Sequence, residues 1–321
     1  MARLIIVLWF TLPLGTIYGQ SFFIPADTLN KPRFYTALSF AGVTYTSFSI
    51  GLYHAWYKNF EQAPFQLFND WKEWEHMDKA GHTHSAYFQG VLTYKGARWT
   101  GLSKKNSILT GIIAGSLFQT TIEVMDGFSS KWGFSIPDIG ANLAGTGIFA
   151  AQQYFWDEQR ISIKVSSMPK AYPDVTIYST DGNQTNSLTA RTNALYGQNY
   201  FERFLKDYNA QTYWMSVNVK SFLHRHHCWP AWLNVGLGYG AENMYGGFDN
   251  SWTSEEASYV LSSDLYPRYR QFYLGLDLDL TKIKTKSPFL KSIFSVINIF
   301  RIPLPALEYN TQGKFVFHAF K

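Results

Sequence analysis

The sequence predicts an α+β protein, with an N-terminal bundle of about four helices followed by an antiparallel β-rich half, either an open sheet or a small barrel. Up to Arg160, apolar and small residues recur at the spacing of a helix face. After Arg160 apolar and polar residues alternate, as they do in strands, and turn-rich segments separate the alternating stretches. We therefore expect a helical domain at residues 20–159 and a β-rich domain at residues 160–321.

The composition favours a protein that meets a membrane surface. Only 16% of the 321 residues are charged, whereas 18% are aromatic, including 21 Tyr and 11 Trp. Amphipathic aromatic rings prefer the boundary between lipid and water. The formal net charge is +5, but the basic residues are scattered and form no basic stripe, so we expect no nucleic-acid partner.

Residues 1–19 have the order of an export signal. A basic residue, Arg3, precedes a short apolar core, and the small residue Gly19 permits cleavage before Gln20. The alternative is a short N-terminal membrane anchor, which we consider less consistent with the length of the core. The only cysteine is Cys228, so there is no lipobox and no internal disulfide.

Four segments of the first half are expected to be helices. The first, Tyr35 to about Tyr57, carries no charge and is long enough to cross a bilayer. A second helix begins at Asp78, a third runs from about Lys105 to Val124, and a fourth begins at Ser135 and reaches about Trp156. The fourth is rich in Ala and Gly, which favours close approach to neighbouring helices.

The second helix has a polar stripe at the spacing of one helix face. Its members are Asp78, His82, Ser85, Gln89 and Thr93. Such a stripe must face water, a partner helix or a cavity. Asp78 and His82, which belong to it, are therefore the first candidate site residues.

The clearest strand pattern lies at residues 271–281, where Phe and Leu alternate with Tyr, Gly, Asp and Thr. Asp277 and Asp279 share the polar side of this strand, which we expect to be exposed to water. Further strands are expected at residues 161–165, 213–219, 233–239 and 315–320, and weaker ones near 175–178, 259–262 and 294–302.

Two arrangements of this β half remain open. The strands either form an outer-membrane sheet or barrel with an apolar side toward lipid, or a soluble or peripheral sheet that packs its apolar face on the helices. We favour the second arrangement, because several candidate strands are shorter than the ~9–11 residues that a spanning strand needs.

Six polar residues of the helical half form the candidate site: Asp78, His82, Glu123, Asp126, Asp138 and Asn142. Asp78 and His82 are one helical turn apart, as are Asp138 and Asn142, so each pair shares a helix face. The turn at residues 125–134 is short enough to bring Glu123 close to the start of the fourth helix. We therefore expect Asp78, His82, Glu123, Asp138 and Asn142 to converge.

Simpler explanations exist for two of these acids. Asp78 can serve as a helix N-cap, and Asp138 lies three residues after Ser135, as in a variant of the capping box. For either Asp alone we favour the cap. Glu123 ends an apolar helix, where the helix dipole disfavours an acid, and we find no capping role for it.

These motifs resemble those of known envelope families. Asp78-Lys79-Ala80-Gly81-His82, then Glu123, then Asp138 to Gly145 resembles the VanZ-like pattern, which is an Asp-Lys-x-x-His helix, a Glu and an Asp-x-x-x-Asn-x-x-Gly. With Asp126-Gly-Phe-Ser129 and Trp132-Gly-Phe-Ser135 included, the chain more closely resembles the YfiM-like envelope proteins, a family of unknown function. The resemblance covers residues 70–160.

The resemblance implies a compartment rather than a reaction. VanZ-like proteins are linked to glycopeptide-antibiotic tolerance without an established reaction, and YfiM-like proteins are mostly described as envelope lipoproteins. This chain departs from that description because it has no lipobox cysteine. In addition, the β-rich half of this chain has no counterpart in the short VanZ-like proteins.

Two function classes follow. The first is an exported, membrane-associated structural or ligand-binding protein of the cell envelope, located at the outer membrane or on the periplasmic side of a membrane, with a lipid or cell-wall component as its partner. The second is an enzyme on an envelope lipid or cell-wall precursor, with His82 as acid/base. We favour the first, because no nucleophile or oxyanion hole is identifiable. We expect no cofactor and no metal, and the histidines around Cys228 are interpreted as a solvated turn.

Overall fold

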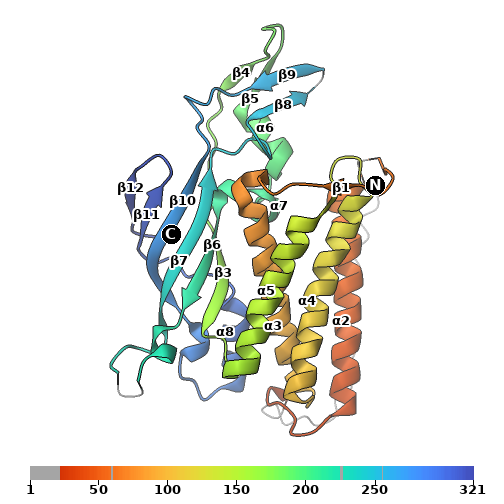
Figure 1. The fold of residues 1–321 in the computed structure, drawn as a ribbon, viewed down its shortest axis with the longest axis vertical. Helices are drawn as coiled ribbons and strands as arrows, with labels where there is room; N and C mark the ends of the chain where they lie inside the picture. Colours follow the sequence, from red (N-terminus) through yellow and green to blue (C-terminus); the bar gives the residue numbers. More distant parts are fainter. Residues whose placement is uncertain (1–21, 59–60, 225–226, 255) are drawn as a thin grey trace.

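The computed structural model describes residues 22–321 except 59–60, 225–226 and 255. A layer of long helices lies beside an open antiparallel sheet, and two small hairpins extend beyond one end of the sheet (Figure 1). The α+β prediction is confirmed. The predicted export signal at residues 1–19 lies outside the described residues.

The four predicted helices are α2 (Lys31–Leu52), α3 (Met77–Trp99), α4 (Lys104–Gly127) and α5 (Ile136–Trp156). The first begins four residues before the expected Tyr35, because Asn30 caps it and Pro32 fits its first turn. It ends in a π-helical turn, Tyr53–Tyr57. Ser103 and Ser135 cap α4 and α5 in the same way as Asn30 caps α2.

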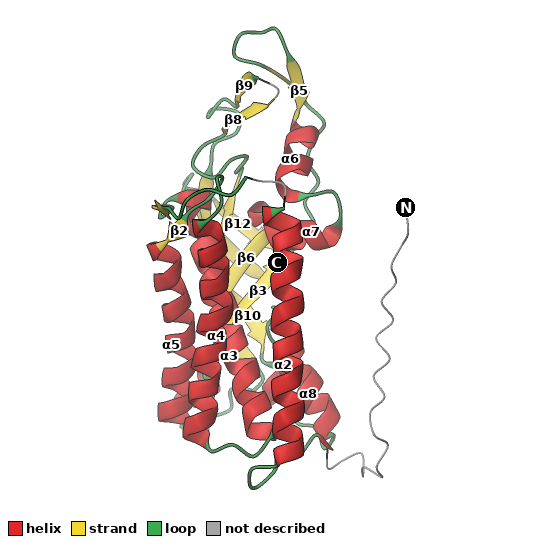
Figure 2. Ribbon diagram, turned by 90° about the vertical axis from the view of Figure 1, so that its right-hand side faces the viewer, coloured by secondary structure: helices red, strands yellow, loops and turns green. Residues whose placement is uncertain are grey.

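Helix α3 is the centre of the bundle, because it packs closely on both α4 and α5. Glycines permit this approach: a Cβ built on Gly145 would lie 2.2 Å from the carbonyl oxygen of Thr83, and one on Gly115 would lie 2.9 Å from that of Ala86. Helix α2 lies at the outer side of the bundle, next to α4 in Figure 1 and toward the viewer in Figure 2, and none of its residues is buried.

The main sheet has six strands in the order β12-β11-β10-β7-β6-β3, and all neighbouring pairs are antiparallel. The strands are β3 (Ile161–Ser167), β6 (Gln211–Val217), β7 (Leu233–Glu242), β10 (Tyr269–Leu278), β11 (Ala306–Asn310) and β12 (Phe315–His318). The sheet is open, and at one edge a parallel bridge pairs Val165 of β3 with Phe300.

Smaller elements surround the sheet. Short two-stranded pairs are formed by β1 (Leu67–Phe68) with β2 (Phe134–Ser135), β4 (Thr176–Tyr178) with β5 (Thr185–Ser187), and β8 (Ser251–Ser254) with β9 (Ala257–Val260). Three further helices are α6 (Leu188–Tyr196), α7 (Tyr200–Lys206) and α8 (Pro288–Ile297).

The weak strand prediction at residues 294–302 is wrong, because its first part lies in α8. Ser287 caps this helix, Pro288 occupies its first turn, and Phe289, Ile293 and Ile297 recur at a helical spacing. A short apolar run fits a period of two as well as a helical period, and here the Ser287 cap and Pro288 favour the helix. The sequence patterns did not predict strand β11, helices α6 and α7, or the short strands β1, β2, β5 and β8.

The polar side of the sheet is buried, which corrects the expectation for Asp277 and Asp279. Both are almost fully buried, and the Asp277 carboxylate lies 2.7 Å from the Lys164 ammonium in a fully buried ion pair. Asn298 accepts a hydrogen bond from Lys164, and the Arg301 guanidinium stacks 3.8 Å from the Trp214 ring. The segment after α8 therefore covers the polar face and shields it from water.

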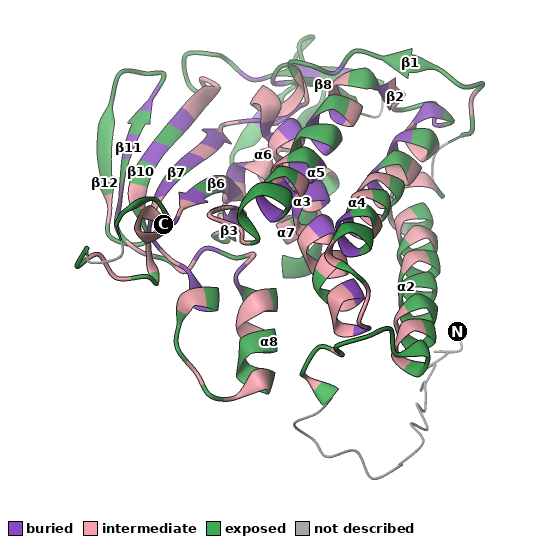
Figure 3. Cartoon of the chain, turned by 60° about the horizontal axis from the view of Figure 1, so that its bottom comes forward, coloured by how far each residue is buried: buried purple, intermediate pink, exposed green. Residues whose placement is uncertain are grey.

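The apolar side of the sheet is only partly covered by helices. Near β6, Met77 of α3 packs with Tyr213, Tyr239 and Ala241, and the ring of His84 lies 5.8 Å from that of Tyr213. The expectation that this face packs on the helices is correct only there. Farther along the sheet, exposed positions are frequent on the strands (Figure 3). The exposed apolar side chains there are Met215, Leu237, Phe272, Leu274, Leu276, Leu307, Tyr309, Phe315 and Phe317.

Candidate functional site

Polar side chains from α3, α4 and α5 meet at one end of the bundle. Asp78 and His82 come from the first turns of α3, Glu123 from the last turns of α4, and Asp138 and Asn142 from the first turns of α5. The short connection between α4 and α5 reverses the chain, so the end of one helix lies beside the start of the next (Figure 1). We call these five residues the polar cluster.

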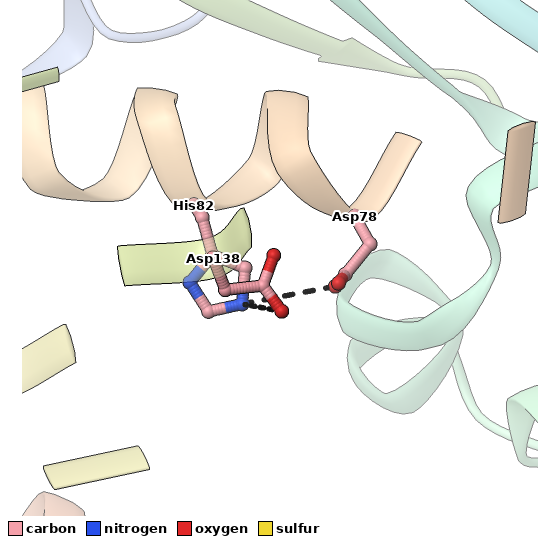
Figure 4. A group of neighbouring side chains, drawn as sticks. All are labelled: Asp78, His82 and Asp138. Carbon is pink, nitrogen blue, oxygen red and sulfur yellow. Dashed lines mark ion pairs between the residues drawn. The ribbon is translucent and has the colours of Figure 1, made fainter. Parts of the chain in front are cut away.

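The Nε2 atom of His82 faces three carboxylates. It lies 3.8 Å from Asp78 Oδ1 and 3.8 Å from Asp138 Oδ2 (Figure 4), and 3.5 Å from Glu123 Oε1. Its other ring nitrogen, Nδ1, lies 3.0 Å from Asn142 Oδ1. Single donor atoms of Asp78, His82 and Asp138 all lie within 4.8 Å of one another, a spacing that could hold a metal ion.

The Lys79 ammonium contacts two carboxylates of the polar cluster and one carboxylate beside it. Its Nζ lies 2.8 Å from Asp138 Oδ1, 2.8 Å from Asp70 Oδ2 and 3.1 Å from Asp78 Oδ2. The two oxygens of Asp138 therefore have different partners, because Oδ1 binds Lys79 while Oδ2 points at His82. Asp70 also accepts a hydrogen bond from the Ser135 hydroxyl.

Glu123 has a capping role that we did not expect. Its Oε2 accepts the backbone N–H of Ser135, the N-cap residue of α5, at 3.0 Å, while the Ser135 hydroxyl accepts the N–H of Asp138. In a capping box the acid within the helix would bind the N-cap N–H. Here an acid from the preceding helix binds it, which leaves the Asp138 carboxylate available to the cluster.

The caps favoured for the two Asp residues alone do not form. The N-cap residue of α3 is His76, so Asp78 is the second residue of the helix. At that position the helix dipole stabilises its negative charge. Asp138 contributes only its backbone N–H to the cap of α5. Both carboxylates are directed instead toward His82 and Lys79.

The carboxylates of the cluster are tightly coupled. Burial, followed by the negative charge of Asp78, raises the pKa of Asp138 to about 10, and burial raises the pKa of Glu123 to about 8. Burial opposes ionisation of Asp78 as well, but its interactions with the neighbouring His82 and Lys79 side chains outweigh burial and lower the pKa of Asp78. Burial likewise opposes the charge on Lys79, but Asp78 and Asp138 outweigh it and raise its pKa.

Asp126, the sixth predicted residue, lies beside the cluster rather than in it. It is one turn beyond Glu123 on α4, and its Oδ1 accepts a hydrogen bond of 2.7 Å from the Tyr57 hydroxyl. Burial raises its pKa to about 7, although the hydrogen bond from Tyr57 opposes this shift.

Two residues of the site were not identified from the sequence. Asp70 comes from the loop before α3, and Tyr208 comes from a 3₁₀ turn, Tyr208–Ala210, of the β-rich half. The Tyr208 hydroxyl donates a hydrogen bond of 2.7 Å to Asp78 Oδ1. No local pattern marks either residue, because both reach the cluster only through tertiary packing.

The cluster is nearly closed. The side chain of His82 is 12% exposed and that of Asp78 is 18% exposed, whereas that of Glu123 is 1% exposed. A cavity of about 270 Å³ lies elsewhere, between α3, α5, β3 and α8, and no residue of the cluster lines it. The polar cluster is therefore largely shielded from solvent.

Residues 67–154, which contain the whole polar cluster, match the model of a family described as "Predicted periplasmic lipoprotein (DUF2279)". No curated protein and no solved structure matches the chain. The family match supports an exported protein of the periplasm or cell envelope. The likeness to VanZ-like and YfiM-like proteins, and the domain boundaries at residues 19 and 159, stay predictions.

Proposed function

We propose that this chain is a membrane-associated protein of the cell envelope, whose apolar outer faces contact lipid and whose polar cluster binds a ligand within the helical bundle. The observation that carries the membrane part is the orientation of the sheet. Its polar side is buried with Asp277, and its apolar side is exposed around Leu274. A sheet that met water on its outer side would have the reverse orientation.

The helical side has the same character. No charged residue occurs between Asn106 and Phe118 of α4, and Leu109, Ile113 and Leu117 are exposed along that stretch. Among the described residues, α4 is long and apolar enough to cross a membrane by length and composition. A water-facing helix would carry charged residues on its outer face, so lipid is the occupant that fits both sides of the molecule.

The inferred membrane is the outer membrane or the periplasmic side of a membrane, in agreement with the export signal expected at residues 1–19. Lipid is thus the partner that we propose for the outer faces. For the polar cluster, ligand binding is favoured over catalysis on a lipid, because Tyr208 covers Asp78 and the cluster is nearly closed. The enzyme alternative would need a substrate to displace Tyr208 before it reached His82.

Extraction of membranes with alkaline carbonate tests the membrane part. We expect the mature protein to stay in the membrane pellet and to require detergent for release, because its outer faces are apolar. Quantitative release into the supernatant would contradict the proposal. Heat-modifiable migration on gels is a separate measurement. It reports on the stability of the sheet in detergent.

A further inference from the structure

The distances from His82 Nε2 to the neighbouring carboxylates are too long for hydrogen bonds. Three carboxylate oxygens lie 3.5–3.8 Å from His82 Nε2, whereas a charge-assisted N–H···O bond is about 2.7–2.9 Å long. Three carboxylate oxygens thus surround His82 Nε2 without direct hydrogen bonds to it. Two ligand atoms that each lie about 2.0–2.1 Å from a tetrahedral Zn²⁺ ion are about 3.3–3.4 Å apart, close to the 3.5–3.8 Å between Nε2 and the carboxylate oxygens.

Glu123 provides an independent observation. Its side chain is 1% exposed and its Oε1 atom has no hydrogen-bond partner, although Oε2 is bound to Ser135. This unpaired oxygen points at His82 Nε2, the centre of the cluster. A buried carboxylate oxygen without a partner is costly, and a bound cation would remove that cost.

The orientation of His82 is that of a metal ligand. Asn142 Oδ1 accepts a hydrogen bond from Nδ1 of the ring, so the proton of a neutral imidazole lies on Nδ1 and the lone pair of Nε2 is directed at the carboxylates. Ligating histidines almost always donate their second ring N–H in this way. The hydrogen bond from Tyr208 to Asp78 Oδ1 supports one of the carboxylates similarly.

We infer that His82 Nε2, Asp78 Oδ1, Asp138 Oδ2 and Glu123 Oε1 bind one divalent transition-metal ion of the Zn²⁺ or Mn²⁺ class. One imidazole and three carboxylates suit such an ion better than Ca²⁺ or Mg²⁺, which prefer oxygen ligands alone. This ion is then the ligand of the polar cluster. The inference rests on the proposed function only in treating that cluster as a binding site.

The alternative is a structural lock, in which a protonated His82 balances the carboxylates without a metal. A lock predicts direct hydrogen bonds from the imidazolium, and the spacing of 3.5–3.8 Å does not provide them. Lys79 already pairs with Asp70, Asp78 and Asp138. The oxygens that face His82 are therefore left for a second cation.

Metal binding is tested on the full mature protein in detergent, stripped with EDTA and dialysed. Isothermal titration with Zn²⁺ and Mn²⁺ gives stoichiometry and affinity, with Mg²⁺ as a comparison and elemental analysis as a check on bound metal. We expect one ion per chain, and at least 10-fold weaker binding for Asp78→Asn and His82→Gln. Asp126→Asn, a buried carboxylate beside the cluster, and His227→Ala, in the exposed loop near Cys228, should bind as the unmodified chain does.

Thermal unfolding of the stripped protein keeps the test independent of whether the variants fold. At 100 times the dissociation constant, Zn²⁺ or Mn²⁺ should raise the Tm by about 5 °C or more. Absence of stoichiometric binding, binding unchanged in His82→Gln, or binding lost in His227→Ala would each overturn the metal site. Carbonate extraction involves no metal, so the membrane proposal would fail or stand separately.

Discussion

His82 of α3 and Asn142 of α5 are joined by a hydrogen bond of 3.0 Å between Nδ1 and Oδ1. This contact fixes the plane of the imidazole and directs Nε2 toward Glu123 and the two Asp carboxylates. Because both residues are within the first turns of their helices, the contact also depends on the close packing of α3 on α5. The polar cluster and the packing of the bundle are thus linked.

Replacing Asn142 with Ala should weaken metal binding by about 10–100-fold, because removal of the partner that orients a ligating histidine usually has that effect. The measurement is the dissociation constant for Zn²⁺ by titration. Gln153→Ala is a matched control on the same helix, since its amide binds Tyr94 far from the cluster and should leave the affinity unchanged. Equal affinities for all three chains would show that Asn142 does not orient His82.

Gly145→Ala should destabilise the protein by about 2 kcal/mol or more, because the new Cβ would lie 2.2 Å from the backbone oxygen of Thr83 and force α3 and α5 apart. Gly147→Ala is the control, since nothing lies within 4 Å of its Cβ position. Helix propensity alone should make that second variant more stable by up to about 1 kcal/mol. Denaturant unfolding measures both, and a similar change in the two variants would refute close packing at Gly145.

Leu274→Glu should reduce membrane attachment without unfolding the protein. Leu274 is 53% exposed on the apolar face of β10, so a charge there would have to enter lipid. Flotation with vesicles gives the bound fraction, and circular dichroism checks the fold. Val260→Glu serves as the control, because Val260 is similarly exposed but belongs to the small β8–β9 hairpin. An equal loss in both variants would mean that the sheet face has no special contact with lipid.

The sequence was sufficient to predict the long helices and the main strands, because their periodic patterns and caps are local. The convergence of His82 with Glu123 could be expected from helix spacing and a short turn. Asp70 and Tyr208 could not, since their places depend on how a loop and the β-rich half pack on α3. The burial of Asp277 could not either, because alternation shows that a strand has two unlike faces but not which face is covered.

Asp126 should make stability depend on pH in a direction opposite to that of an ion-paired acid. Burial raises its folded pKa to about 7, above the ordinary value of 3.8, so between these values the folded state binds a proton that the unfolded state does not. Stability should therefore rise as the pH falls from 7 toward 4. Asp126→Asn should remove part of this rise, as measured by the Tm at pH 5 and pH 8. An identical pH profile in both proteins would mean that Asp126 does not titrate in this range.

The most direct test of the polar cluster as one site is a double-mutant cycle between His82→Ala and Glu123→Gln, which come from different helices and are 3.5 Å apart at Nε2 and Oε1. The free energy of unfolding is measured for the unmodified chain, both single variants and the double variant. If the two groups act together, the effects are non-additive, with a coupling of roughly 0.5–3 kcal/mol. Additive effects, within about 0.5 kcal/mol, would contradict a shared site.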